Sequence, residues 1–238
     1  MRQRAYLAAA VSQTVLLLAG SNSSGAAEPA VRAQRFARLP DWVGVWQTEA
    51  GAAAVSGAGA RAAAAGAASL PPSFKSCGPV GFPTIMNIPL ADFMFELLVT
   101  PEQTLLVSTD GTVRHIYTDG RSHPKPQDLW PTPAGDSIGH WEGPTLVVDT
   151  IAREPGPVAP IRGSPVLSAA AHFTERLHRL DVDTLEDVMT IDDPQGLKQP
   201  LHSTIRYTRA HDLDRLIPID CEHDRNIIGD HLGIAPPR

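Results

Sequence analysis

Residues 95–120 read FELLVTPEQTLLVSTDGTVRHIYTDG, and this stretch decides the fold. Three short runs rich in Leu, Val, Ile and Thr are separated by Pro101-Glu102-Gln103 and by Asp110-Gly111. A further turn signal, Asp119-Gly120, follows the third run. Asp-Gly between such runs is a strong hairpin signal because both residues tolerate a positive φ. The stretch therefore predicts consecutive antiparallel strands.

The rest of the chain continues this pattern. Further strands are predicted at 40–46, 145–150, 172–180, 184–191, 201–209 and 215–221, with Pro/Gly-rich loops at 121–139 and 153–168. Regular short strands without βαβ alternation predict a sandwich or a closed barrel. Gly44-Val45-Trp46 resembles the Gly-x-Trp of lipocalins, in which it starts the first strand and closes one barrel end. We therefore expect an all-β fold, an antiparallel lipocalin-like β-barrel of about 8–9 strands that encloses one small ligand.

Composition narrows the range of partners. The 238 residues carry 20 Lys and Arg against 26 Asp and Glu, a net charge of −6, so nucleic acid is not expected as a partner. With 42% hydrophobic and 19% charged residues, the chain has the composition of a soluble globular protein. Residues 50–69 are almost entirely Ala and Gly and predict a loop or weak helix without chemistry. The oligomeric state stays open.

The first 27 residues have the pattern of a secretory signal peptide. Arg2 and Arg4 precede an apolar run over 5–20, and Gly25-Ala26-Ala27 supplies small residues for cleavage. The alternative is a transmembrane anchor, for which the run is short and interrupted. We expect an exported protein, periplasmic or secreted, with no membrane span after cleavage. Residues 28–75 would hold a linker, the first strand and the Ala/Gly-rich insertion, and 76–238 the barrel domain.

Export would place both cysteines in an oxidising compartment. Cys77 and Cys221 bracket most of the predicted β region. Two cysteines in a secreted chain usually pair, so a disulfide between them is expected. The alternative is two buried free thiols.

Several motifs together resemble a large family of exported bacterial proteins without a settled activity. Residues 114–124 (RHIYTDGRSHP) and 137–150 (SIGHWEGPTLVVDT) carry most of the resemblance. It extends over about residues 76–224, through 174–176, 183–186 and 190–194. The chain departs from the family pattern at Pro144, where Asp is usual, and at 164–168, where a Pro-His-Ser-like loop is usual. The resemblance implies an exported protein and leaves its reaction unassigned.

Ionisable residues gather at two junctions between loops and strands. Asp119, Arg121 and His123 follow one predicted strand, and His140 and Glu142 precede the next. If these strands are neighbours, both groups lie at the barrel mouth, where small-molecule sites occur. There, either histidine could act as general base.

These residues are assigned roles on that basis. Glu142 could orient a histidine or act as the acid, and Arg121 could hold an anionic oxygen. The alternative is that Asp119-Gly120-Arg121 is only a turn and Trp141 only a plug of the barrel. We assign Asp119 to the catalytic set, and His115, Tyr117, Trp141, Asp149 and His172 to substrate binding. Tyr117 shares a strand face with His115 and could donate to a substrate oxygen, and the alternative is that the two are an ordinary barrel-lining pair.

Two further carboxylates fall in phase with apolar strand residues. Glu175 shares a strand face with Phe173 and Leu177, and Asp149 shares one with Val147. A carboxylate on an apolar face needs a partner or a raised pKa. Glu175 is therefore either a buried catalytic acid or base, or one half of a structural ion pair, for instance with Arg206.

Metal and cofactor chemistry is not expected. The nine histidines form no H-E-x-x-H or H-x-H pattern. His140 and Glu142 could share a strand face, but a metal would need a third ligand such as His123 or His172. No Gly-rich phosphate loop is present, which argues against nucleotide enzymes.

Two functions remain. The first is a cofactor-independent lyase or isomerase that uses acid–base chemistry on an apolar, aromatic or polycyclic small molecule. The second is a lipocalin-like binding protein without turnover. Fold alone does not choose between them.

Overall fold

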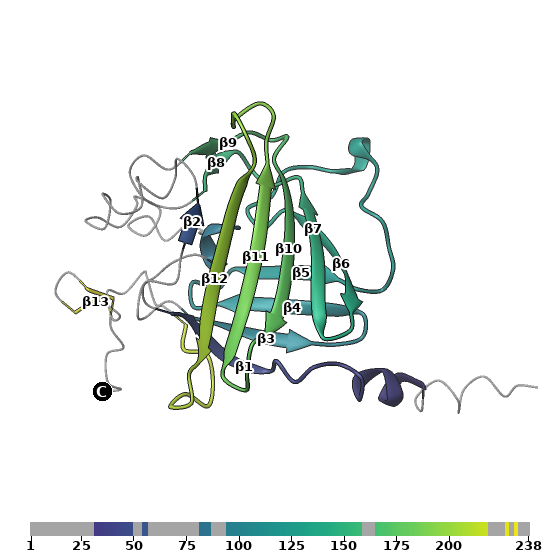
Figure 1. Ribbon diagram of the computed structural model, residues 1–238, viewed down its shortest axis with the longest axis vertical. Coiled ribbons are helices and arrows are strands. Elements are labelled where there is room, and N and C mark those ends of the chain that lie inside the picture. The colour runs from purple at the N-terminus through teal and green to yellow at the C-terminus, as the bar shows by residue number, and fades with distance from the viewer. Residues whose placement is uncertain are drawn as a thin grey trace, which may run out of the picture.

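Nine strands close into one β-barrel with almost no helix, as predicted (Figure 1). The computed structural model describes residues 31–49, 54–56, 81–86, 94–158, 165–218, 227–228 and 231–232. Its elements are β1 (Gly44–Thr48), β2 (Ala54–Ser56), η1 (Thr84–Met86), β3 (Met94–Val99), β4 (Gln103–Ser108), β5 (Val113–Tyr117), η2 (Pro126–Asp128), β6 (Asp136–Glu142), β7 (Thr145–Ile151), β8 (Gly156–Pro157), β9 (Val166–Leu167), β10 (His172–Arg179), β11 (Thr184–Asp192), β12 (Leu201–Arg209), β13 (Ile227–Ile228) and β14 (His231–Leu232).

Strand β1 closes the barrel. It pairs antiparallel with β3 on one side and with β12 on the other. The barrel order is β1-β3-β4-β5-β6-β7-β10-β11-β12, and β2 adds to the far end of β12. In Figure 1 the strands β6, β7, β10, β11 and β12 stand in one layer, and β3 to β5 run across behind them. Gly44-Val45-Trp46 thus begins the closing strand.

One pair of barrel strands is parallel, which differs from the expected antiparallel meander. Strand β6 runs parallel to β5, with Ile116 opposite Ser137. A parallel neighbour requires a connection long enough to return the chain to the starting end. Residues 118–135, with four prolines, provide that return. The predicted loop 121–139 was therefore too long, because β6 already begins at Asp136.

Two local predictions were wrong. Residues 54–56, within the Ala/Gly-rich insertion, form strand β2 on β12 rather than a loop or helix. Residues 215–218 form no strand. Three other expectations concern residues outside those described: the signal peptide, the Cys77–Cys221 disulfide and the remainder of the 215–221 strand. No helix within the described residues is long and apolar enough to cross a membrane.

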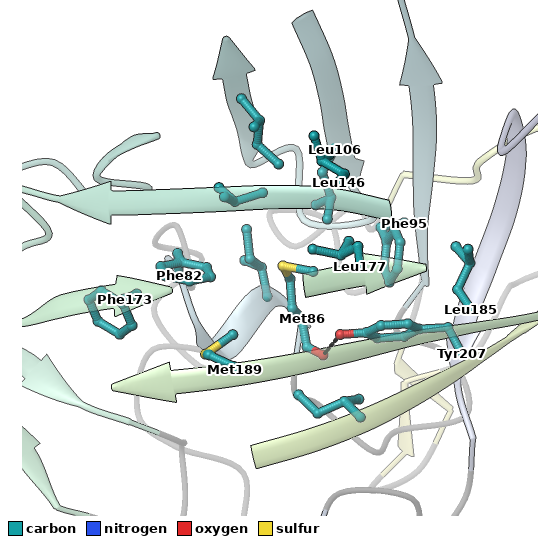
Figure 2. Packing of buried hydrophobic residues seen from close by; sticks show 14 of the residues in the cluster. Phe82, Met86, Phe95, Leu106, Leu146, Phe173, Leu177, Leu185, Met189 and Tyr207 are labelled. Atoms are coloured by element: carbon teal, nitrogen blue, oxygen red, sulfur yellow. Dashed lines mark hydrogen bonds between the residues drawn. The ribbon is translucent and has the colours of Figure 1, made fainter. Parts of the chain in front are cut away.

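Side chains and a short chain segment fill the barrel interior. Period-2 alternation directs one face of each strand inward, and this face supplies most of the buried apolar cluster. The segment 81–86 lies inside as well, with Phe82 and Met86 fully buried. Figure 2 shows Met86 among side chains of the surrounding strands, with its carbonyl accepting a hydrogen bond from the Tyr207 hydroxyl at 2.8 Å. Residues 81–86 thus occupy the space in which a lipocalin-like ligand was expected.

Candidate functional site

The outer face of β6, β7 and β10 carries four of the predicted site residues: His140, Glu142, Asp149 and His172. Strand alternation turns Ser137 and Leu146 inward, so Asp136, His140 and Asp149 point outward. The register places Asp149 opposite Ile138 on β6 and opposite Thr174 on β10. The candidate site therefore lies outside the barrel wall rather than in its interior.

A chain of alternating carboxylates and imidazoles runs along this face. His123 places Nδ1 2.5 Å from Asp136 Oδ1 and Nε2 2.8 Å from Asp149 Oδ1. The other oxygen of Asp149 lies 2.6 Å from Nε2 of His172. A histidine that faces a carboxylate with each nitrogen donates from both only as the imidazolium. We call Asp136, His123, Asp149 and His172 the His–Asp chain.

The four members differ in how open they are to solvent. The His123 side chain is 16% exposed and that of Asp136 26%, whereas Asp149 and His172 are 40% and 45% exposed. The chain therefore leads from a half-buried end at Asp136 to an open end at His172. Sequence reasoning named His123, Asp149 and His172 but missed Asp136. The Pro133-Ala134-Gly135 turn that begins β6 was the signal that could have found it.

A groove of about 410 Å³ lies at the half-buried end. Asp136 lines it together with residues of β5 and of the turn before β6: Thr112, Val113, His115, Tyr117, Thr132, Pro133, Ala134, Gly135 and Ser137. Gly135 has φ +73°, and a Cβ there would approach Thr150 Cγ2 to 2.8 Å. Only glycine fits this turn, which brings Asp136 to the groove.

His115 and Tyr117 form one wall of the groove. Their rings stack with centroids 5.8 Å apart. The Arg121 guanidinium lies 3.9 Å from the centre of the Tyr117 ring and also binds Asp119 at 2.6 Å. The hydrogen bond from Arg121 lowers the pKa of Asp119, and the same bond raises the pKa of Arg121. Arg121 and Asp119 therefore form a charged pair beside the groove.

His140 and Glu142 make a separate group further along β6. His140 Nε2 lies 3.3 Å from Glu142 Oε1, and Arg176 binds the other Glu142 oxygen at 2.8 Å. Hydrogen bonds from Arg176 and His140 lower the pKa of Glu142, so it is a carboxylate at neutral pH. No hydrogen bond or ion pair in the described chain joins this group to His123. The two groups that were expected to meet at the barrel mouth are not joined.

Two predicted site residues point inward. Trp141 packs against the core, its ring centroid 5.1 Å from that of Trp42, which fits the role of a plug rather than a substrate contact. Glu175 is fully buried and forms a bidentate ion pair with Arg114, with Nη1 to Oε1 at 2.9 Å. Arg206 instead pairs with Glu186 at 2.8 Å. The structural reading of Glu175 was therefore right in kind, with a different partner.

Neither a metal-ligand cluster among the described residues nor a comparison with known proteins identifies the reaction of this site. Within the described ranges, no three His, Cys, Asp or Glu side chains are placed to hold a metal ion. No protein-family model matches the chain, and a comparison with curated proteins gives no match either. The resemblance to exported bacterial proteins therefore rests on the motifs alone.

Proposed function

We propose that the chain is an exported enzyme that carries out cofactor-independent acid–base chemistry, as a lyase or isomerase, in the groove between β5 and β6. The observation that carries the proposal is the position of His123 between Asp136 and Asp149, beside a groove that Asp136 lines. General acid–base catalysis needs a proton acceptor that is held in place and open to substrate. Asp136 meets both conditions.

Asp136 is the base in this proposal. Its Oδ1 is held by His123, and its Oδ2 makes no hydrogen bond to any described residue. Oδ2 can therefore take a proton from a substrate carbon in the groove. His123 holds the carboxylate in position. The catalytic histidine expected from the sequence thus becomes a positioning residue.

The opposite wall supplies donors. Tyr117 carries a hydroxyl, and His115 carries an imidazole ring whose Nδ1 lies 3.3 Å from Gln103 Oε1. Either could donate to a substrate oxygen on which negative charge develops. Val113, Pro133 and Ala134 make the rest of the lining partly apolar, which favours an apolar substrate body with one polar group. An aromatic or polycyclic ketone fits these features.

The test is turnover of a panel of aromatic and polycyclic ketones, with substrate and product compared by mass and by isomer composition. Asp136→Asn and His123→Ala should each lower turnover about a hundredfold or more, because positioned acid–base groups contribute at least that factor. His211→Ala is the matched control, since His211 is an exposed histidine that pairs with Asp183 away from the groove. Full activity in both site variants would contradict the proposal.

A binding protein without turnover is the second candidate, favoured by the same partly apolar groove. In that case a ketone of the panel would bind, Val113→Asp would abolish binding, and the compound would be recovered unchanged in mass and isomer. Equal binding by wild-type protein and Val113→Asp would show that the ketone does not bind in the groove, and would exclude the groove as the site of either function.

A further inference from the structure

The barrel interior holds three ionisable side chains that the proposed chemistry does not use. Arg114 on β5, Glu175 on β10 and Asp187 on β11 are all 0% exposed. Glu175 lies opposite Met189 in the β10–β11 register, so Asp187 lies two residues away on the same inward face. One buried cation thus faces two buried acids.

Every donor of Arg114 already has a partner. The five N–H groups of a guanidinium form a fixed fork. Nε donates to Ser137, Nη1 to Glu175 and to the Met86 sulfur, and Nη2 to Glu175 and Thr150. The guanidinium therefore has no N–H left for a second carboxylate.

Asp187 consequently has no hydrogen-bond donor among the described residues to stabilise a negative charge. No donor in the described chain reaches either of its carboxyl oxygens. The nearby Tyr207 hydroxyl is engaged with the Met86 carbonyl. An ionised carboxyl without a partner is strongly disfavoured in a protein interior, and such a group keeps its proton instead. A protonated Asp187 gains an O–H that can donate to the Glu175 carboxylate.

We propose that the barrel interior is a proton-binding site, in which Asp187 carries a proton that it shares with Glu175, and that loss of this proton to solvent loosens the buried segment 81–86. The groups that face Asp187 are Glu175 from β10, Arg114 from β5 and Tyr207 from β12. Burial and the negative charge of Glu175 both raise the pKa of Asp187 well above its ordinary value, while Arg114 opposes them. This site is independent of the groove and of the proposed reaction.

Arg114 links the proton to the buried segment. Its Nη1 lies 2.9 Å from the Met86 sulfur, and its guanidinium lies 3.8 Å from the centre of the Phe82 ring. A thioether is a weak acceptor, whereas an ionised carboxylate is a strong one. Once Asp187 loses its proton, its carboxylate competes with the Met86 sulfur for the N–H of Arg114 Nη1. The contacts that hold Phe82 and Met86 inside the barrel therefore weaken as the pH rises.

The test follows the Asp187 carboxyl by carbon-13 NMR and the amides of Phe82, Ile85 and Met86 by hydrogen exchange, on the full chain as the pH rises. These amides donate to Pro133, Gly81 and Pro83 respectively, so exchange reports their release. Asp187 should stay protonated well above the pH at which Asp192, an exposed residue of the same strand, titrates. As the pH rises toward the value at which Asp187 titrates, protection of the three amides should fall by up to about tenfold per pH unit beyond the intrinsic change, and it should level off above that value.

Asp187→Asn supplies the decisive comparison, because the amide keeps the size of the side chain and cannot ionise. Protection of the three amides in this variant should not depend on pH beyond the intrinsic change, and Asp192→Asn should behave as the wild type. Three results would overturn the proposal: titration of Asp187 together with Asp192, identical protection in wild type and Asp187→Asn at every pH, or an Asp187 that keeps its proton until the whole barrel unfolds.

Discussion

Replacing Arg114 by Met tests the energetics of the barrel interior most directly. The substitution removes the cation and leaves Glu175 buried without its bidentate partner. Breaking a fully buried pair from one side costs about 3–5 kcal/mol, because the remaining charge has no compensation. Ser137 and Thr150 also lose the donors that now reach them at 3.3 and 2.9 Å. We expect Arg114→Met to lower the free energy of unfolding by about 3–5 kcal/mol, a large part of the stability of a typical domain.

Urea unfolding at pH 7, followed by tryptophan fluorescence, measures this loss. Arg206→Met is the matched control, because its pair with Glu186 is half exposed and such a pair contributes at most about 1 kcal/mol. The double variant Arg114→Met/Glu175→Leu removes both charges together and should recover most of the loss, since an apolar replacement of a buried pair is often neutral. A loss below about 1 kcal/mol in Arg114→Met, or a double variant as unstable as the single one, would refute the reasoning.

Two further predictions concern a turn and a loop. Gly135→Ala should lower the free energy of unfolding, measured in urea, by roughly 1–3 kcal/mol, because φ is +73° and the new Cβ would meet Thr150 and Ile151. Gly120→Ala is the control: its φ is +85°, but open space surrounds it, so the loss of stability should be smaller. Equal losses in the two variants would exclude the clash as the cause. Burial alone would raise the pKa of Asp193, but hydrogen bonds from Ser168, Gly196 and Gln195 outweigh it and lower the pKa. The contribution of Asp193 to stability is therefore present above the ordinary Asp pKa of about 3.9 and is lost as the pH falls through the lowered value. In Asp193→Asn the melting temperature should therefore depend less steeply on pH in the acid range than in the wild type. An unchanged slope would refute this.

Turn chemistry made most of the barrel predictable. Asp110-Gly111 and the 181–183 turn lie between runs whose alternation fixes both their length and their inward face, and the predicted strand 201–209 matches β12 residue for residue. The parallel pair β5–β6 was not predictable in the same way. A Pro-rich connection carries no hydrophobic period, so nothing in residues 121–135 says that the chain returns to the starting end before β6 begins.

The interior was misjudged for a related reason. Residues 81–86 have almost no propensity of their own, since Gly81 and Pro83 interrupt any regular pattern. Only contacts with distant strands, such as the bond from Tyr207 to Met86, hold this segment inside. The barrel wall decides which of the predicted site residues meet. His123 reaches Asp136 and Asp149, whereas His140 stays with Glu142.

Alternation could nevertheless have found the buried charges. Placing His115 and Tyr117 on the outer face of β5 also places Arg114 inward, in phase with the buried Ile116. The same period puts Glu175 inward between Phe173 and Leu177, and Asp187 inward between Leu185 and Met189. Arginine cannot lose its charge in a protein, so one of the two acids must be its anionic partner. Among the five donors of Arg114, those on Nη1 and Nη2 bind both oxygens of a single carboxylate, that of Glu175. The second acid is then surplus to the available charge, which is why the proton is assigned to Asp187.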